Sequence, residues 1–274
     1  MPKHATGPKQ FAGITMMLAF LFFALLPIIW ALILAFRPRD RLFEPIWESP
    51  FALTLDNFNA LLRSEFPFAL FNSFVTAGTA TILALIIGIP AGFALAKGRS
   101  QRKFIASWAL LLLRMAPPVG FVIPLFLIYL NIGFLDTWAG LIAAYMVLTL
   151  PLVVWSTWTS FSQIPDELIE AALLDGASLF QALVKVVIPA ARPGIVAAAV
   201  LAFLLAWNDF FFALIITRGD TITAPVAVMN FVSYASVEWG GIALASIVLT
   251  LPTVPVIIVA NKYIVQSMGG AVKG

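Results

Sequence analysis

The sequence contains no cysteine and only one histidine, His4. The lack of cysteine excludes disulfides, thiolate ligands for a metal and covalent attachment of haem. A single imidazole near the N-terminus argues against a histidine-based metal or catalytic site, so we expect neither kind of site in this chain. The glycine-rich phosphate loop GxxxxGKS or GxxxxGKT does not occur either. The chain is therefore not expected to hydrolyse a nucleotide by itself.

Charged residues are also scarce. They make up 11% of the chain, whereas 62% of its residues are hydrophobic and the mean hydropathy is +1.02. A helix of about 20 apolar residues crosses a bilayer core. The chain is therefore predicted to be an all-α polytopic membrane protein with six transmembrane helices, at residues 14–36, 72–96, 104–130, 138–160, 192–216 and 240–262. The first span lacks a small-residue cleavage site after it, so we expect it to be retained.

The orientation of the spans follows from their short connections, because Lys and Arg resist translocation. The connection 97–103, KGRSQRK, holds four basic residues, whereas the connection 131–137, NIGFLDT, holds none. We therefore place both termini, including the N-terminal segment 1–13, in the cytoplasm, and the loop 37–71 outside. The chain is expected to be a multi-pass protein of the inner cell membrane. The net charge of +3 reflects this bias and does not indicate binding to nucleic acid.

One polar stretch interrupts the apolar sequence between the fourth and fifth predicted spans. It reads EAALLDGASLFQALVKVVIP at 170–189. Gly176 suits the left-handed residue that ends a helix. Ser178 and Gln181 form the S-x-x-Q pattern of a capping box, which begins a second helix, and Pro189 is expected to end it. The pattern predicts a helix, a turn and a helix on the cytoplasmic side.

The first of these helices is predicted to begin at Pro165, whose missing N–H is no loss in a first turn. Acidic residues near its start complement the helix dipole and share one face: Asp166, Glu167 and Glu170. At about 100° per residue, the opposite face holds Leu168, Ala171 and Ala172. The two alanines would let another backbone come close. From periodicity alone, an amphipathic surface helix that covers the ends of the spans explains the pattern as well.

The spacing within this stretch resembles the cytoplasmic signature of the binding-protein-dependent ABC importer permeases. That signature is E-A-A, three residues, G, nine residues and then I-x-L-P. The matching residues are Glu170, Ala171, Ala172, Gly176, Val186, Ile188 and Pro189. Two conservative replacements are the only departures. The match is specific because a glycine and a proline must fall at fixed distances from the E-A-A.

Shorter segments resemble the carbohydrate-uptake branch of that family, and specifically its MalG-like permeases. They are NS at 72–73, IPDEL at 164–168, P-x-x-x-P-G at 189–194, WND at 207–209 and TAPVAV at 223–228. The resemblance implies one transmembrane permease domain over residues 14–274, with a coupling region at 161–191. The connection 97–103 departs from the branch's usual glycine- and proline-containing basic loop.

The resemblance also implies how such a chain works. Two homologous permease chains form a pathway in membrane lipid, two ATPase subunits dock beneath them and bind ATP and Mg²⁺, and an extracytoplasmic solute-binding protein delivers the substrate. This chain would bind no cofactor and would be a non-catalytic subunit. Its polar stretch would be the coupling helix, seated in a groove of one ATPase. The residues implied in that contact are Glu170, Ala171, Ala172, Asp175, Gly176 and Pro189.

Polar side chains within the predicted spans are candidates for the substrate pathway, because each is costly in lipid. Arg114, in the third span, would bind sugar hydroxyls or an anionic group. Alternatively, it binds carbonyls freed by the prolines that follow it or extends to an interface. Trp207, Asn208 and Asp209 in the fifth span combine an aromatic face with hydrogen-bonding groups, which suits a pyranose ring. Packing or a helix break explains these three residues equally well.

The substrate implied by the resemblance is a sugar or a sugar-like solute. A polyol, or an anionic glycoside or glycerol derivative, is the alternative within the same importer class. A secondary transporter would need carboxylates in mid-span, for which Asp209 is the candidate. A membrane-embedded enzyme would need a cluster of nucleophile, base or metal ligands, which the sequence does not offer.

Overall fold

The structure is a computed structural model that describes residues 8–42, 44–45, 47–48, 52–98, 105–106, 108–110, 112, 117–233 and 237–271. Within these ranges the regular structure is helical, apart from one isolated antiparallel bridge between Val232 and Val237. The all-α fold class predicted from the sequence is thus confirmed.

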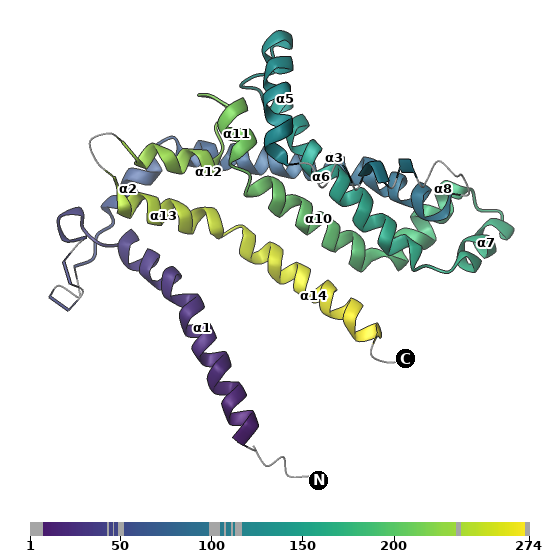
Figure 1. The fold of residues 1–274 in the computed structure, drawn as a ribbon, viewed down its shortest axis with the longest axis horizontal. Coiled ribbons are helices and arrows are strands. Elements are labelled where there is room, and N and C mark those ends of the chain that lie inside the picture. Colours follow the sequence, from purple (N-terminus) through teal and green to yellow (C-terminus); the bar gives the residue numbers. More distant parts are fainter. Residues whose placement is uncertain are drawn as a thin grey trace. The chain divides into compact units, whose positions relative to one another are not determined.

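The chain consists of long apolar helices with short helices between some of them (Figure 1). The long ones are α1 (Pro8–Ala35), α3 (Phe66–Lys97), α5 (Pro118–Ile132), α6 (Trp138–Ser162), α10 (Arg192–Trp207), α13 (Trp239–Thr250) and α14 (Thr253–Ala271). The short ones are η1 (Arg39–Arg41), α2 (Asp56–Arg63), α7 (Asp166–Leu174), α8 (Leu179–Ala182), the π-helical η2 (Leu183–Val187), α9 (Ile188–Ala190), α11 (Phe211–Ile216), α12 (Ala224–Ala227) and η3 (Val228–Phe231).

Four helical segments among the described residues are long and apolar enough to cross a bilayer: Phe11–Ala35, Phe66–Lys97, Trp138–Ser162 and Trp239–Lys262. They coincide with the first, second, fourth and sixth predicted spans. A fifth span results if the bent pair Leu179–Ala190 and Arg192–Trp207 is counted as one. Much of the first half of the third predicted span, 104–130, lies outside the described residues. The count of six spans therefore stays a prediction.

The fifth predicted span, 192–216, is not one continuous helix. α10 ends at Trp207, and α11 begins only at Phe211. The side-chain amide of Asn208 donates to a carbonyl of the last turn of α10, 2.8 Å away. A carboxylate oxygen of Asp209 accepts N–H groups of the first turns of α11 at 3.0 and 3.2 Å. The break is stabilised in this way because both side chains bind backbone groups at helix ends.

The chain divides into two compact units. The first comprises Met1–Phe66 and Val228–Val248, and the second comprises Pro67–Ala227 and Leu249–Gly274. In the first unit, an ion pair of 2.7 Å joins Arg39 to Glu238. The assignment of residues 14–274 to one permease domain stays a prediction.

Small residues bring the helices of the second unit together. α10 packs along α6 and α14, and its alanines at four-residue spacing are buried: Ala198, Ala202 and Ala206. α3 approaches α6 closely at Gly92, where an added Cβ would lie 2.1 Å from the hydroxyl oxygen of Thr157. That hydroxyl also donates to the carbonyl of Gly88, 3.1 Å away. Such close approaches are typical of helix packing in lipid.

The connection between α5 and α6 is tied to the loop after α11. Asp136 has a positive φ of 54°, and its carboxylate accepts the backbone N–H of Arg218 at 2.9 Å and the hydroxyl of Thr221. Burial alone would raise the pKa of Asp136, but the hydrogen bonds from Thr221 and from backbone N–H groups outweigh it. The pKa of this carboxyl therefore lies below its ordinary value of 3.8.

The start of α3 joins the same loop through the NS dipeptide noted in the sequence. The buried side-chain amide of Asn72 donates to the carbonyls of Asp220 and Ile222, both at 3.0 Å, and its oxygen accepts the indole N–H of Trp138 at 2.9 Å. The hydroxyl of Ser73 accepts the N–H of Ala224 at 2.9 Å. The NS and TAPVAV segments, far apart in sequence, are therefore in contact.

Candidate functional site

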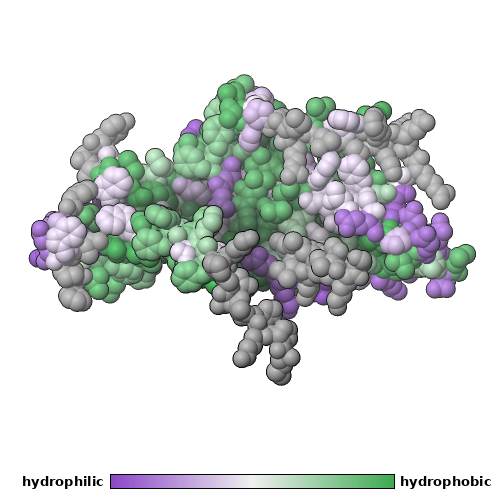
Figure 2. All heavy atoms as spheres, turned by 60° about the horizontal axis from the view of Figure 1, so that its bottom comes forward, coloured by the Kyte–Doolittle hydropathy of each residue, from purple (hydrophilic) through white to green (hydrophobic). Residues whose placement is uncertain are grey.

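The helix, turn and helix predicted between the fourth and fifth spans is present as α7 and α8. Figure 1 shows both at one end of the second unit, where α6 ends and α10 begins. Figure 2 shows hydrophilic side chains gathered at this end, next to the hydrophobic surface of the longer helices. α7 begins at Asp166, with Pro165 in extended conformation just before it. The segment is thus a polar end of an otherwise apolar unit.

The turn after α7 is closed by two backbone hydrogen bonds. Gly176 has a φ of +85°, as predicted for the residue that ends this helix. Its N–H donates to the carbonyl of Leu173, and the N–H of Ala177 donates to the carbonyl of Ala172, both at 3.0 Å. These are the two bonds of a Schellman motif, so the direction in which α8 leaves α7 is fixed by the backbone itself.

The predicted capping box at the start of α8 is also present. The Ser178 hydroxyl accepts the N–H of Gln181 at 3.2 Å, and the Gln181 side chain accepts the N–H of Ser178 at 2.8 Å. The second helix does not end at Pro189, because the helical path continues through η2 and α9 to Ala190. A π-helical stretch just before a proline relieves the clash of its ring with the preceding turn. The path then bends by 82° into α10.

The inner side of the segment packs on the ends of the spans. Ile169 of α7, Leu183 and Val187 are buried in one cluster with Phe93 of α3 and Phe161 of α6. The two phenyl rings meet edge to face, with centroids 6.2 Å apart. Because buried side chains are close-packed, this cluster links α7 directly to the ends of α3 and α6.

A lysine adds a polar tie between α3 and α7. The ammonium of Lys97, the last residue of α3, donates to a carboxylate oxygen of Asp166 at 2.6 Å and to the carbonyl of Ile164. The Lys97 side chain is 14% exposed, whereas that of Asp166 is 72% exposed. From the sequence, Lys97 indicated only that the connection 97–103 is cytoplasmic, and no contact was predicted for it. The rest of that basic connection, residues 99–104, lies outside the described residues.

The outer side of the segment is exposed. Glu170, Ala171, Asp175 and Gly176 are exposed, whereas Ala172 is half-buried against the inner cluster. The sequence predicted that the two alanines of E-A-A lie on one exposed face. In the structure they do not, because only Ala171 is exposed. The reason is that Ile169, between the acidic positions, is the side chain that α7 buries in the chain's own core.

Large apolar residues on this outer side were missed by the sequence analysis. Leu174 is 89% exposed and Phe180 is 72% exposed, and Leu173 and Leu179 are exposed as well. Exposed apolar side chains that gather within a polar segment are typical of protein–protein contacts. The signal was present in the sequence, because Leu174 lies four residues after Glu170 and hence on the same helix face.

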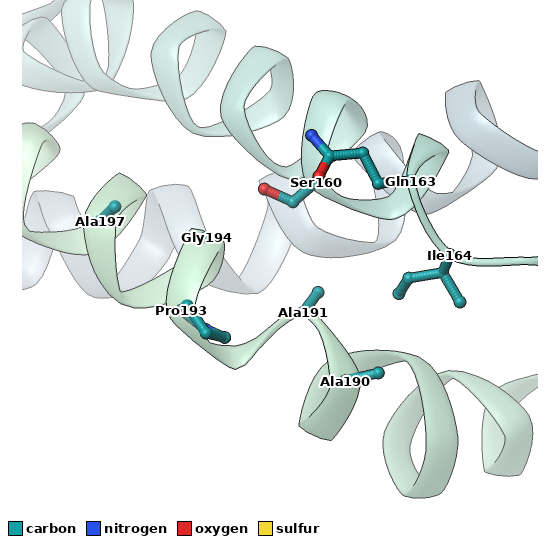
Figure 3. Close-up of a pocket in the computed structure, with 8 residues that line it drawn as sticks. All are labelled: Ser160, Gln163, Ile164, Ala190, Ala191, Pro193, Gly194 and Ala197. Carbon is teal, nitrogen blue, oxygen red and sulfur yellow. The ribbon is translucent and has the colours of Figure 1, made fainter. Parts of the chain in front are cut away.

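A cavity of about 510 Å³ lies at the 82° bend. Figure 3 shows Ser160 of the last turn of α6, with Gln163 and Ile164 just after that helix, on one side of it, and small residues between the end of α9 and the first turns of α10 on the other. The latter are Ala190, Ala191, Pro193, Gly194 and Ala197. The bend is thus lined mostly by small side chains and is not completely filled by them.

The candidate pathway residues are only partly described. Arg114 lies outside the described residues. Trp207 is 1% exposed, and its indole N–H donates to the carbonyl of Leu249 at 3.1 Å. Its ring meets that of Phe74 at 4.6 Å between centroids and stacks on Phe203 at 5.5 Å. Trp207 is therefore packed inside the unit, and the helix breaks at the two residues after it. Contact with substrate stays a prediction for these three residues and for Arg114.

Possible metal ligands were compared only among the described residues. In the part of the chain that the structure describes, no group of three or more such residues is placed to hold a metal ion.

The chain is similar to known transport proteins over most of its length. The profile of the family described as binding-protein-dependent transport system inner membrane component matches residues 84–269. The trehalose transport system permease protein SugB of Mycobacterium tuberculosis is 38% identical over 257 residues, which cover 92% of this chain and 93% of that protein. The sulfoquinovosyl glycerol transport system permease protein SmoH of Agrobacterium fabrum is 32% identical over 254 residues, 91% of this chain and 89% of that protein.

A solved structure shares the fold. A chain of a bacterial ABC transporter involved in the import of the acidic polysaccharide alginate matches with a TM-score of 0.77. The two chains are 20% identical, and the match covers 96% of this chain and 99% of that one.

Proposed function

Because the chain belongs to the family of binding-protein-dependent transport system inner membrane components, we propose that it is one of two homologous permease chains in an ATP-driven importer for a sugar or sugar-like solute. It is a multi-pass permease of the inner membrane and works with an external binding protein and an ATPase. In our proposal two ATPase subunits bind ATP and Mg²⁺, this chain is non-catalytic and binds no cofactor, and both of its termini are cytoplasmic.

The observation that carries the proposal is the α7–α8 segment. It is capped at its turn, packed on its inner side and exposed on its outer side. A segment of this kind serves as a rigid contact for a partner that moves. We assign the contact with the ATPase to Glu170, Ala171, Ala172, Asp175, Gly176 and Pro189, together with the exposed Leu174 and Phe180.

Five of these residues have a distinct physical role in the proposed contact. The Glu170 carboxylate would pair with a basic residue of the ATPase, and the small Ala171 beside it would allow close approach. Leu174 would bury its side chain on docking, which supplies affinity. Gly176 sets the angle between α7 and α8, and Ala172 supports the helix from the inner side.

The structure offers two routes from this segment into the membrane. The first passes through the Lys97–Asp166 tie and the Phe93–Phe161 cluster to the ends of α3 and α6. The second passes through the 82° bend beside the cavity to α10. A displacement of α7 by an ATPase would move these span ends together, which is what alternating access to a pathway requires.

The proposed substrate class rests on the relatives. SugB is named for trehalose, a neutral disaccharide, and SmoH for sulfoquinovosyl glycerol, an anionic glycoside. A sugar is therefore our proposal, and an anionic glycoside or glycerol derivative remains the alternative within the same class. We propose Arg114, Trp207, Asn208 and Asp209 as pathway residues. For Trp207 this requires a second conformation, because its ring is buried here.

Transport by the reconstituted importer tests the proposal. The ligand of the binding protein encoded beside this permease is first identified by calorimetry, with trehalose and sulfoquinovosyl glycerol as the neutral and anionic probes. Uptake of that ligand into proteoliposomes is then measured with and without ATP and binding protein. We expect uptake to require both. Uptake that follows a proton gradient without the ATPase would contradict the proposal and favour a secondary transporter.

A further inference from the structure

The short helix α2 in the first unit has three different faces. Asn57 and Leu61, one turn apart, are buried against the chain itself. Phe58 and Leu62, also one turn apart, are 40% and 56% exposed. The remaining polar side chains form a third face: Asp56, Asn59 and Arg63. At about 100° per residue the three faces follow one another around the helix.

α2 is held at the level where membrane spans end. The side-chain amide of Asn57 donates to the carbonyls of Ala35 and Arg37, at 3.0 and 3.2 Å. Ala35 is the last residue of the first apolar span. The same amide touches Gly240, the second residue of another span, where an added Cβ would lie 2.4 Å from its nitrogen. Both neighbouring span ends thus place α2 at the boundary of the bilayer.

The sequence that follows α2 also indicates that this helix lies at the boundary of the bilayer. α2 ends at Arg63, and the span Phe66–Lys97 begins three residues later. A helix of eight residues is about 12 Å long, too short to cross a hydrocarbon core of about 30 Å. Its exposed apolar face is therefore not transmembrane.

A helix that lies between protein and water needs only one apolar face. The second apolar face of α2 requires a second apolar neighbour, and the bilayer that the adjoining spans enter is continuous with this position. We propose that α2 is an interfacial helix. It lies in the plane of the membrane surface, with Phe58 and Leu62 among the lipid headgroups and upper acyl chains and with Asn59 in water.

The residues around α2 fit this placement. Trp47 is 81% exposed, and Leu53 and Leu55, just before the helix, are exposed as well. Tryptophan is enriched at membrane interfaces, and Arg63 at the end of α2 suits the phosphates of lipid headgroups. The interfacial helix would fix the depth at which α1 ends and α3 begins.

The absence of cysteine makes a direct test simple. Phe58→Cys, Leu62→Cys and the matched control Asn59→Cys are each labelled with an environment-sensitive fluorophore. All three positions are exposed, so we expect the fold to tolerate each substitution. The full chain with its partner permease and ATPase is placed in nanodiscs of phosphatidylethanolamine and phosphatidylglycerol. Quenching is measured with a nitroxide on the lipid and with a water-soluble nickel complex.

We expect labels at Phe58 and Leu62 to show blue-shifted emission, strong quenching by the lipid nitroxide and loss of quenching by nickel. The label at Asn59 should show the reverse. Equal nickel quenching at all three positions would overturn the proposal, because the face would then lie in water. Protection of Phe58 only after the binding protein is added, without lipid quenching, would overturn it as well and assign the face to a protein partner.

Discussion

Gly176→Val tests whether the shape of the α7–α8 turn matters for coupling. Gly176 has a φ of +85°, and an added Cβ would meet no atom within 4 Å. The cost of the substitution is therefore conformational rather than steric, about 1–2 kcal/mol for a side chain in the left-handed region. The chain can avoid that strain only by opening the turn, which gives up the two Schellman hydrogen bonds of Gly176 and Ala177.

The strain energy and the energy of the two hydrogen bonds determine how Gly176→Val changes the turn. Two hydrogen bonds contribute about 0.5–1.5 kcal/mol each, so opening the turn costs about as much as keeping it strained. Either way the native turn loses about 1–2 kcal/mol relative to other arrangements, which is a factor of roughly 10 in its population. That is too little to unfold the permease, but it makes the strained turn and the opened turn about equally populated, and the opened turn holds α7 and α8 at another angle.

The chain offers a matched control at Gly133, which ends α5. Its φ is +72°, and an added Cβ there would also meet no atom within 4 Å. Gly133→Val should therefore cause a similar strain away from the coupling segment. We expect both variants to reach the membrane at normal abundance. Hydrolysis of ATP stimulated by loaded binding protein should fall to about half or less for Gly176→Val only. Equal losses, or wild-type stimulation in both, would refute the reasoning.

Three further predictions concern the ties within the second unit. Lys97→Met keeps the apolar stem but loses the bonds to Asp166 and to the carbonyl of Ile164. It should destabilise the segment by about 1–2 kcal/mol and speed limited proteolysis between residues 162 and 190; unchanged cleavage would contradict a tie. Gly92→Val should lower the free energy of unfolding by about 1–3 kcal/mol through overpacking. Gly78→Val should not, because an added Cβ there meets no atom within 4 Å. Equal effects of the two variants in thermal unfolding would argue against close contact between α3 and α6 at Gly92. The pKa of Asp136 lies below 3.8, so its stabilising effect is present above that pH and is lost as the pH falls through the lowered pKa. Asp136→Asn should flatten the acid limb of a thermal stability profile measured against pH, and an unchanged limb would exclude this carboxylate as its source.

Features set by neighbouring residues could be predicted from the sequence. The long apolar helices follow from hydropathy alone, and both the turn at Gly176 and the capping box at Ser178 follow from local backbone chemistry. The end at Pro189 was predicted one residue early, because a π-helical stretch accommodates the proline.

Features set by distant residues could not be predicted. The amphipathic pattern of α7 does not say which face the chain itself covers, and packing against Phe93 and Phe161 selects Ile169. The tie between Lys97 and Asp166 joins residues 69 positions apart. The break after Trp207 is a local feature, which the sequence offered only as one alternative because two polar residues, Asn208 and Asp209, are averaged out within a long apolar hydropathy window. Their carbonyl and N–H partners are visible only in the fold.

The central claim is that the outer side of α7 and α8 contacts the ATPase, and cross-linking tests it most directly. A photoactivatable residue at Leu174, which is 89% exposed, is compared with the same residue at Leu130 of α5, which is 59% exposed. The importer is assembled with its partner permease and ATPase and then irradiated. We expect a cross-link to the ATPase from Leu174 and none from Leu130. An assembled, ATP-hydrolysing complex without a cross-link from Leu174 to the ATPase would contradict it.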